Sequence, residues 1–238
     1  MSSNWMKLHR FYINPDTAEL ERTFWLHDER LRNQWTRVLR YREGDQVVLF
    51  DGVAAERLYK LARIEPDAVQ LELITEFERT LPDRHVYLFF SLLKKDKNDW
   101  VLQKCTELGV RNFVPILADR SEKTGFNLER AGKIVIEAAE QCGRSDIPQV
   151  REPLALDTAL ADYKGKVDLF VADETLSTIN YQTSTIKNPI GIFIGPEGGW
   201  TEAELKLFAQ AGAGHFHLGS LTLRAETAAV AAATRLFS

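Results

Sequence analysis

The sequence predicts an α/β protein in which a small β-rich domain precedes a larger domain built on a mainly parallel sheet. Up to about residue 74, short β-like segments are broken by the turn sequences NPD, EGD, DG and EPD. Beyond residue 84, apolar strand-like segments alternate with helical ones. The charged stretch 75–83, which contains Pro82, separates the two patterns. We therefore expect one domain over residues 1–74 and a second over residues 82–238.

The first domain is expected to be a small β-barrel or sandwich that carries one short helix. Its strands are expected at 6–13, 46–52, 57–66 and 68–74. The exception is the segment 28–42, in which Leu31, Trp35 and Leu39 recur at helical spacing.

The second domain shows the alternation of strand and helix that is typical of parallel sheets. Strands are expected at 85–93, 112–118, 167–173, 189–195 and 215–219. Helices are expected at 99–108, 127–143, 202–211 and 226–237.

Composition narrows the functional classes. The net charge of −4 gives no overall attraction for nucleic acid, so a polyanion would have to bind a local basic surface. Cys105 and Cys142 stand in neither a CxxC motif nor a metal-ligand spacing, which favours a reducing, cytoplasmic setting. The longest apolar run, around 86–93, is too short to span a bilayer, and the N-terminus lacks a signal-peptide core. We expect a soluble, unsecreted protein without a membrane partner.

The segment FIGPEGGWTEAE, residues 193–204, predicts a strand, a glycine loop and a helix start. Backbone N–H groups and the helix dipole at such a place favour an anion, often a phosphate. Here, however, the loop has no GK[ST] ending and no GxGxxG spacing, and Glu197 would repel a phosphate. The loop therefore favours a neutral or cationic ligand.

Part of this segment is explained without any ligand. Thr201 and Glu204 match a capping box, Trp200 can pack on Leu205, and Gly212 is a plausible helix stop. Pro196 is not explained in this way, because it fixes the backbone directly after a strand and leaves carbonyl groups exposed.

The C-terminal segment HFHLGSLTLRAETAAVAAATRLFS predicts a short strand, a loop over 219–225 and an alanine-rich helix. Alanines at 228, 229, 231, 232 and 233 leave this helix almost without bulk. An ordinary amphipathic helix would carry Leu or Ile on its buried face. We therefore expect another backbone to approach the helix closely.

These two segments resemble the two cofactor motifs of the RsmE family, the small-subunit ribosomal RNA uracil-N3 methyltransferases of the SPOUT class. The stretches KKDKNDWVLQKCTELGVRNFVPILADRS and AAEQCGRSDIPQV are similar to the middle of that family, and WTRVLRYREGDQVVLFDG is similar to its PUA-like RNA-binding barrel. The chain departs from the family at Thr222 and Ala225, where isoleucine and threonine are more usual.

The resemblance implies a SPOUT domain whose chain forms a deep trefoil knot, a rare exception to unknotted folding. It also implies a homodimer, S-adenosylmethionine (AdoMet) bound by three loops without a metal, and a substrate that is 16S ribosomal RNA or the assembled small subunit. The third loop is expected near 172–174. The expected cofactor residues are Ala172, Ile194, Gly195, Pro196, Glu197, Gly198, Leu218, Gly219, Ser220, Leu221, Leu223 and Arg224.

The implied reaction requires a base and a cation. Uracil N3 carries a proton at neutral pH, so the proton must leave as the methyl group arrives, and the flanking carbonyls then carry negative charge. Arg224 is the candidate cation that holds these carbonyls. Glu226 is the candidate base or orienting group, with the alternative that it is only a favourable acid at a helix start. The target base must be unpaired or flipped.

Basic residues in both domains are candidates for RNA binding. In the first domain, aromatic residues Trp35 and Tyr41 are interleaved with arginines that have no acid between them. The candidate RNA-binding residues are Arg30, Arg32, Arg37, Arg40, Lys94, Lys97 and Arg144. The alternative for each is an ordinary solvated charge. A metal site at His215 and His217 is disfavoured because no further ligands accompany them.

Three other functions are less consistent with the sequence. A SPOUT ribose 2′-O-methyltransferase would carry asparagine and serine where this chain has LRAETA. A non-catalytic RNA-binding protein would not be expected to keep intact GPEGG and LRAET motifs. A nucleotide-phosphate enzyme is disfavoured by Glu197 and by the missing lysine of the phosphate loop.

Overall fold

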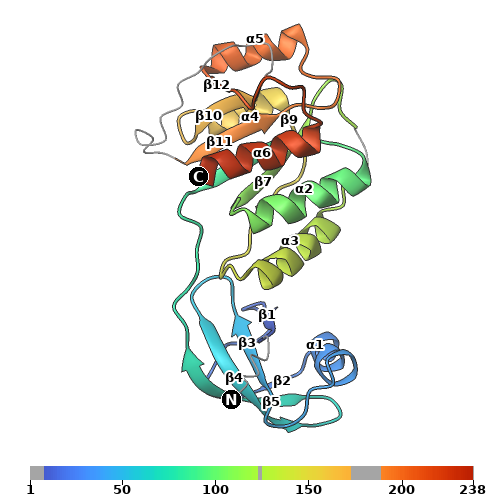
Figure 1. Cartoon of the computed structure of the whole chain (residues 1–238), viewed down its shortest axis with the longest axis vertical. Coiled ribbons are helices and arrows are strands. Elements are labelled where there is room, and N and C mark those ends of the chain that lie inside the picture. Colours follow the sequence, from blue (N-terminus) through green and yellow to red (C-terminus); the bar gives the residue numbers. More distant parts are fainter. Residues whose placement is uncertain (1–7, 123–124, 173–188, 238) are drawn as a thin grey trace. The chain divides into compact units, whose positions relative to one another are not determined.

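A computed structural model describes residues 8–122, 125–172 and 189–237 (Figure 1). By its internal contacts the chain divides into two compact units. One comprises Met1–Leu81 with Ala139–Ile147, and the other comprises Pro82–Ala138 with Pro148–Ser238. The segment Ala139–Ile147, which includes the end of a helix of the second half of the chain, thus belongs to the β-rich unit. The domain bounds 1–74 and 82–238 stay a prediction.

The first unit contains a five-stranded sheet in the order β1-β3-β4-β5-β2. The strand β1 pairs with β3 in parallel, and the other neighbours are antiparallel. The strands are β1 (Arg10–Tyr12), β2 (Thr23–Leu26), β3 (Gln46–Phe50), β4 (Glu56–Ile64) and β5 (Val69–Glu76). The sequence did not predict β2, because only Leu26 of its four residues is buried and no alternation marks it.

One helical segment packs on this sheet, and it is shorter than predicted. It comprises α1 (Glu29–Asn33) followed by a π-helical turn, η1 (Gln34–Val38), whereas the helical spacing extended to residue 42. Asp28 caps its start by accepting a hydrogen bond from Leu31 N at 2.9 Å. The helix ends because Arg40 adopts a positive φ of 58°.

The second unit contains a seven-stranded sheet in the order β12-β10-β11-β6-β7-β8, with β9 also paired to β7. All of its strand pairs are parallel, which confirms the predicted α/β architecture. The strands are β6 (Val86–Ser91), β7 (Asn112–Leu117), β8 (Gln149–Val150), β9 (Leu154–Ala155), β10 (Asp168–Ala172), β11 (Ile190–Ile194) and β12 (Gly214–Phe216).

The helices of this unit largely follow the predicted pattern. They are α2 (Lys95–Glu107), α3 (Leu128–Cys142), α4 (Leu156–Tyr163), α5 (Glu202–Ala211) and α6 (Ala225–Phe237). The helix α2 begins four residues earlier than expected, whereas α5 has the predicted bounds. The elements α4, β8 and β9 were not predicted, because they are too short to show a clear period in the sequence.

Aromatic residues form much of the core between the sheet and the helices α4 and α5. Phe89 of β6 stacks on Phe193 of β11 with ring centroids 4.2 Å apart, and Phe193 meets Phe208 of α5 at 5.0 Å. Ala159 and Leu160 of α4 belong to the same buried cluster. This core fixes β11, whose end leads directly into the GPEGG loop.

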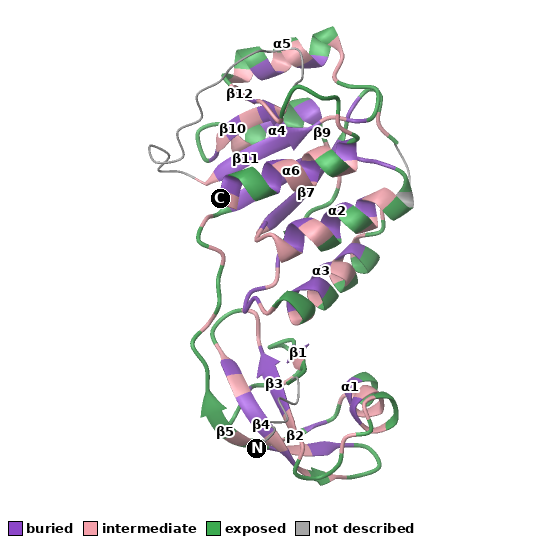
Figure 2. Ribbon diagram, viewed as in Figure 1, coloured by how far each residue is buried: buried purple, intermediate pink, exposed green. Residues whose placement is uncertain are grey.

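The alanine-rich helix α6 packs beside α2 and against β6 and β11 (Figures 1 and 2). Its Ala229, Ala232 and Ala233 are fully buried. Small side chains let these backbones approach closely, as the sequence predicted. The trefoil knot implied by the family resemblance stays a prediction.

Candidate functional site

A pocket of about 770 Å³ lies at the carboxyl ends of strands β10 and β11. In open parallel sheets this edge is the usual place for a ligand, and the volume is that of a typical small-molecule site. The pocket is lined by Lys94, Lys97, Ala172, Ile194, Gly195, Pro196, Glu197, Gly199, Trp200, Leu205, Phe216, Leu218, Gly219, Leu221, Thr222, Leu223, Arg224, Ala225 and Ala228.

The GPEGG loop, residues 195–199, is anchored by the start of α5. Thr201 Oγ1 accepts a hydrogen bond from Glu204 N at 3.3 Å, and Glu204 Oε2 accepts one from Thr201 N at 2.7 Å. This reciprocal pair is the predicted capping box. The predicted stop at Gly212 is also confirmed, because its φ of 75° places it in the left-handed region.

The segment that follows β7 braces the same loop from a second direction. Asp119 N donates to Glu204 Oε1 at 2.9 Å, and Arg120 Nη1 donates to Gly198 O at 2.7 Å. Sequence reasoning missed Asp119 and Arg120 as site residues. The only available signal was the sequence ADRS at the end of the stretch that resembles the family.

Trp200 closes one side of the pocket. Its ring lies 4.9 Å from that of Phe208, and it packs with Leu205 on the same core. A Cβ atom at Gly195 would lie 3.0 Å from Trp200 Nε1, so this position has little room for any other residue. Trp200 Nε1 itself is buried and has no hydrogen-bond partner in the described structure.

Lys97 of α2 lies between two acidic residues of the site. It forms an ion pair with Glu197 of the GPEGG loop, and its Nζ lies 3.6 Å from Oε2 of Glu226 in α6. The hydrogen bond from Lys97 lowers the pKa of Glu197, and the same bond raises the pKa of Lys97. Both groups are therefore charged near neutral pH.

The loop over residues 218–224 forms another part of the pocket wall. Leu221 is 77% exposed although it lines the pocket. Arg224 O accepts a hydrogen bond from Ala228 N at 2.8 Å, so the Arg224 carbonyl begins α6 while its exposed side chain lines the pocket. Gly219 has a φ of 134°, which a larger residue would adopt only with strain.

The structure brings most of the predicted cofactor residues together. All of them except Gly198 and Ser220 line the pocket, and Gly198 is covered by the Arg120 side chain. Glu226 does not line the pocket but reaches Lys97 beside it. The expected third loop continues past Ala172 to residues 173 and 174, which lie outside the described residues. Ligand contact by each of these residues stays a prediction.

The predicted RNA-binding residues separate into three groups. Lys94 and Lys97 line the pocket. Arg30, Arg37 and Arg40 are exposed near α1, and Arg32 is half-buried. Trp35, which was expected to accompany them, is fully buried and cannot stack on a base.

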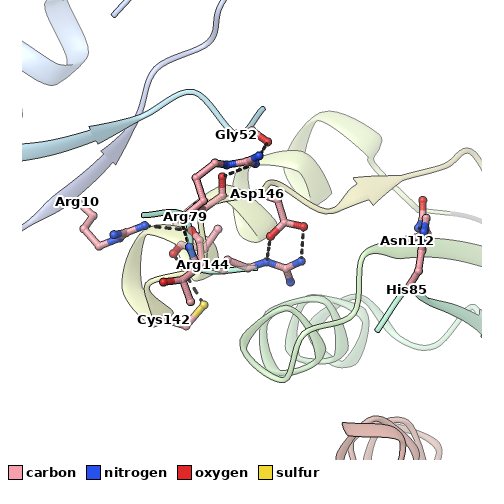
Figure 3. Close-up of polar contacts among 11 residues, drawn as sticks. Arg10, Gly52, Arg79, His85, Asn112, Cys142, Arg144 and Asp146 are labelled. Atoms are coloured by element: carbon pink, nitrogen blue, oxygen red, sulfur yellow. Dashed lines mark hydrogen bonds and ion pairs between the residues drawn. The ribbon is translucent and has the colours of Figure 1, made fainter. Parts of the chain in front are cut away.

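Arg144 belongs to neither surface, although the sequence predicted that it contacts RNA phosphate. It is only 4% exposed, and its Nε and Nη2 donate to the two carboxylate oxygens of Asp146 at 2.9 Å each (Figure 3). Arg144 O also accepts a hydrogen bond from Arg10 at 3.2 Å. A buried guanidinium in such a fork is occupied by its carboxylate, so Arg144 stabilises the segment after α3.

Across the described ranges, no group of three or more His, Cys, Asp or Glu side chains is placed to hold a metal ion. None of the helices within those ranges is both long and apolar enough to cross a bilayer.

Two protein-family models match the chain. Residues 80–237 match the model of an RNA methyltransferase domain, and residues 36–74 match that of an RNA methyltransferase PUA domain. The ribosomal RNA small subunit methyltransferase E of Rickettsia conorii is 30% identical, with 95% of this chain and 94% of the relative covered. The protein of the same name from Bacillus subtilis is 31% identical, with 93% of each chain covered.

Solved structures show the same fold. A ribosomal RNA small subunit methyltransferase E from Neisseria gonorrhoeae bound to S-adenosyl methionine is 29% identical, with a TM-score of 0.85 over 96% of each chain. The methyltransferase Lpg2936 from Legionella pneumophila, in complex with the cofactor SAM, is 26% identical, with a TM-score of 0.86 over 97% of each chain.

Proposed function

The chain belongs to the RsmE family of AdoMet-dependent ribosomal RNA methyltransferases, and we propose that it methylates uracil N3 of one uridine in 16S ribosomal RNA. The observation that carries this proposal is that both motifs with the family resemblance, GPEGG and LTLRAE, meet at one pocket. Close structural relatives hold S-adenosylmethionine.

The residues of the pocket fit AdoMet. Ile194, Phe216 and Leu218 offer apolar surface for an adenosyl group. The buried Trp200 Nε1 lacks an acceptor, and AdoMet carries several acceptor atoms. The carboxylate of Glu197 lines the pocket and suits a sulfonium cation, and together with Glu226 it offsets the charge of Lys97, which disfavours phosphate. When bound, AdoMet supplies an electrophilic methyl group.

Two residues would act on the uracil ring. Arg224 would donate to a uracil carbonyl and stabilise the negative charge that develops when N3 loses its proton. Glu226, whose Oε2 lies 3.6 Å from Lys97 Nζ beside the pocket, would accept that proton. The carboxylate would take the N3 proton, and the methyl group that AdoMet supplies would replace that proton on N3 as its bond to the sulfonium sulfur breaks.

The partners follow from the same assignment. The substrate is 16S ribosomal RNA or the assembled small subunit, with the target base unpaired or flipped. Exposed Arg30, Arg37 and Arg40 would contact RNA phosphates at the first unit, and Lys94 would do so at the pocket of the second unit. The protein would work as a homodimer in the cytoplasm.

Primer extension on 16S ribosomal RNA tests the proposal. N3 methylation removes the Watson–Crick donor and stops reverse transcriptase. Cells that lack this protein should lose one such stop, and expression of the intact chain should restore it. Persistence of every stop in the deletion strain would contradict the proposed function.

Calorimetric titration with AdoMet separates the proposal from the alternative of a non-catalytic RNA-binding protein. Saturable binding of one AdoMet per chain is expected. A chain that bound RNA but showed no heat of binding with AdoMet would support the alternative.

A further inference from the structure

Lys97 connects two site segments that are far apart in the sequence. Glu197 follows β11, and Glu226 lies in the first turn of α6. The side chain of Lys97 is 23% exposed, that of Glu226 is 14% exposed, and that of Glu197 is 49% exposed. The pair between Lys97 and Glu226 is thus the more sheltered one, although it is longer.

The local structure fixes where Lys97 starts. The next residue, Asn98, is buried, accepts a hydrogen bond from Leu93 N at 2.9 Å and donates one to Leu93 O at 2.8 Å. Lys97 N also donates to Lys94 O at 2.9 Å. The backbone of the first turn of α2 is therefore held to the end of β6, and this places the ammonium group beside both acids.

The two acids need a cation between them. Both carboxylates lie within 4.0 Å of the same ammonium group, so they would repel each other if that charge were removed. The carboxylate of Glu226 would be destabilised more than that of Glu197, because its Oε2 is buried and has no hydrogen bond in the described structure. Loss of Lys97 would therefore push the GPEGG loop and the start of α6 apart.

We propose that Lys97 is a positioning residue that ties the GPEGG loop to the first turn of α6 and so sets the shape of the AdoMet pocket. This role replaces the phosphate contact expected from the sequence. It rests on the proposed function, because the pocket is taken to bind AdoMet. An ammonium group already shared by two carboxylates has less charge to offer a phosphate.

A double-mutant cycle with full-length protein tests this role. We expect Lys97→Met to weaken AdoMet binding about tenfold and to raise the KM for AdoMet, since unpaired like charges deform the pocket. Lys97→Arg keeps the charge and should stay within about threefold of the unaltered protein. Lys104→Met is the matched control, because Lys104 lies in the same helix and pairs with Glu107 away from the pocket.

The cycle is completed with Glu197→Gln and Glu226→Gln. Each should relieve part of the defect, so that the double variant with Lys97→Met binds AdoMet better than the product of the two single losses predicts. If Lys97 acted as an isolated charge, the loss of AdoMet affinity in the double variant would equal the product of the losses in the two single variants. If Lys97→Met does not fold, Lys97→Gln takes its place in the same cycle.

Two results would overturn the positioning role of Lys97. If Lys97→Met weakened RNA binding alone and left AdoMet binding unchanged, the phosphate contact would be correct and the positioning role would be overturned. Multiplicative losses in both cycles would overturn it as well. If the unaltered chain bound no AdoMet at all, the proposed function would fail together with it.

Discussion

The two loops that line the pocket are held in different ways. The GPEGG loop is fixed by the capping box at Thr201 and by Arg120, which reaches it from the segment after β7. The loop over 218–224 contains Gly219 with a positive φ and the largely exposed Leu221. One wall is therefore preorganised by polar contacts, while the other presents exposed side chains.

This difference indicates that the two loops have different functions. A braced loop can present carbonyls and a carboxylate in a fixed geometry, which lowers the cost of binding a cofactor. A loop with exposed apolar residues can adjust when a second, larger substrate arrives. Changes in the braced loop should act on stability and cofactor affinity, and changes in the exposed loop should act on transfer.

The largest expected effect is the loss of methyl transfer when Arg224 of the exposed loop is replaced. Arg224→Ala should lower kcat for methyl transfer about 100-fold to 1,000-fold, because the developing charge on the uracil carbonyls loses its donor. AdoMet affinity should change little. Single-turnover assays and calorimetry measure the two quantities separately. Loss of both transfer and AdoMet binding would mean that Arg224 shapes the cofactor pocket instead.

The next effect concerns the anchor of the braced loop. Glu204 is 5% exposed and accepts hydrogen bonds from the backbone of both Thr201 and Asp119. Glu204→Ala should lower the free energy of unfolding by about 2–3 kcal/mol, because buried donors lose their acceptor. Urea denaturation measures this change.

The matched control for this anchor is Glu202→Ala, an exposed acid in the first turn of the same helix. It should lower the free energy of unfolding by about 0.5 kcal/mol, the usual contribution of a favourable charge at a helix start. Equal losses for the two variants would show that the bracing contacts contribute nothing.

A smaller effect is expected from the second brace. Arg120→Ala removes the hydrogen bond to Gly198 O and should weaken AdoMet binding about fivefold, since the loop gains freedom. Calorimetry at constant salt measures the affinity. Arg120→Lys can still reach the carbonyl and should lose less. A variant that bound AdoMet normally but RNA poorly would place Arg120 in the RNA interface.

The smallest effect on stability is expected at Leu221. Leu221→Ser should change the free energy of unfolding by less than about 0.5 kcal/mol, because the side chain is 77% exposed. Its effect should instead appear in the KM for RNA. A loss of several kcal/mol in denaturation would show that this wall is as firmly packed as the other.

Local patterns in the sequence predicted a large part of the fold. The capping box at Thr201 and the stop at Gly212 depend on neighbouring residues, and both were found as predicted. The longer strands of the parallel sheet, β6, β7, β10 and β11, were recognisable as apolar runs. The segment β2 and the helix α4 were missed, because a four-residue strand and an eight-residue helix carry too few positions to establish a period.

The charged residues show what local patterns cannot predict. Arg144 looked like a surface cation in the sequence, yet it is buried against Asp146. Lys97 looked like a phosphate ligand, yet it pairs with Glu197, 100 residues away. A charge has the same appearance in the sequence whether water or a distant carboxylate surrounds it.

The sequence by itself determined which segments form the pocket, because glycine, proline and capping residues act on the backbone within a few positions. Only the tertiary structure decided which charges those segments share. Asp119 and Arg120 reach the GPEGG loop, and Lys97 reaches Glu226, because parallel strands bring distant chain segments to one edge of the sheet. Such pairs depend on strand order, and strand order is set by packing of the whole unit.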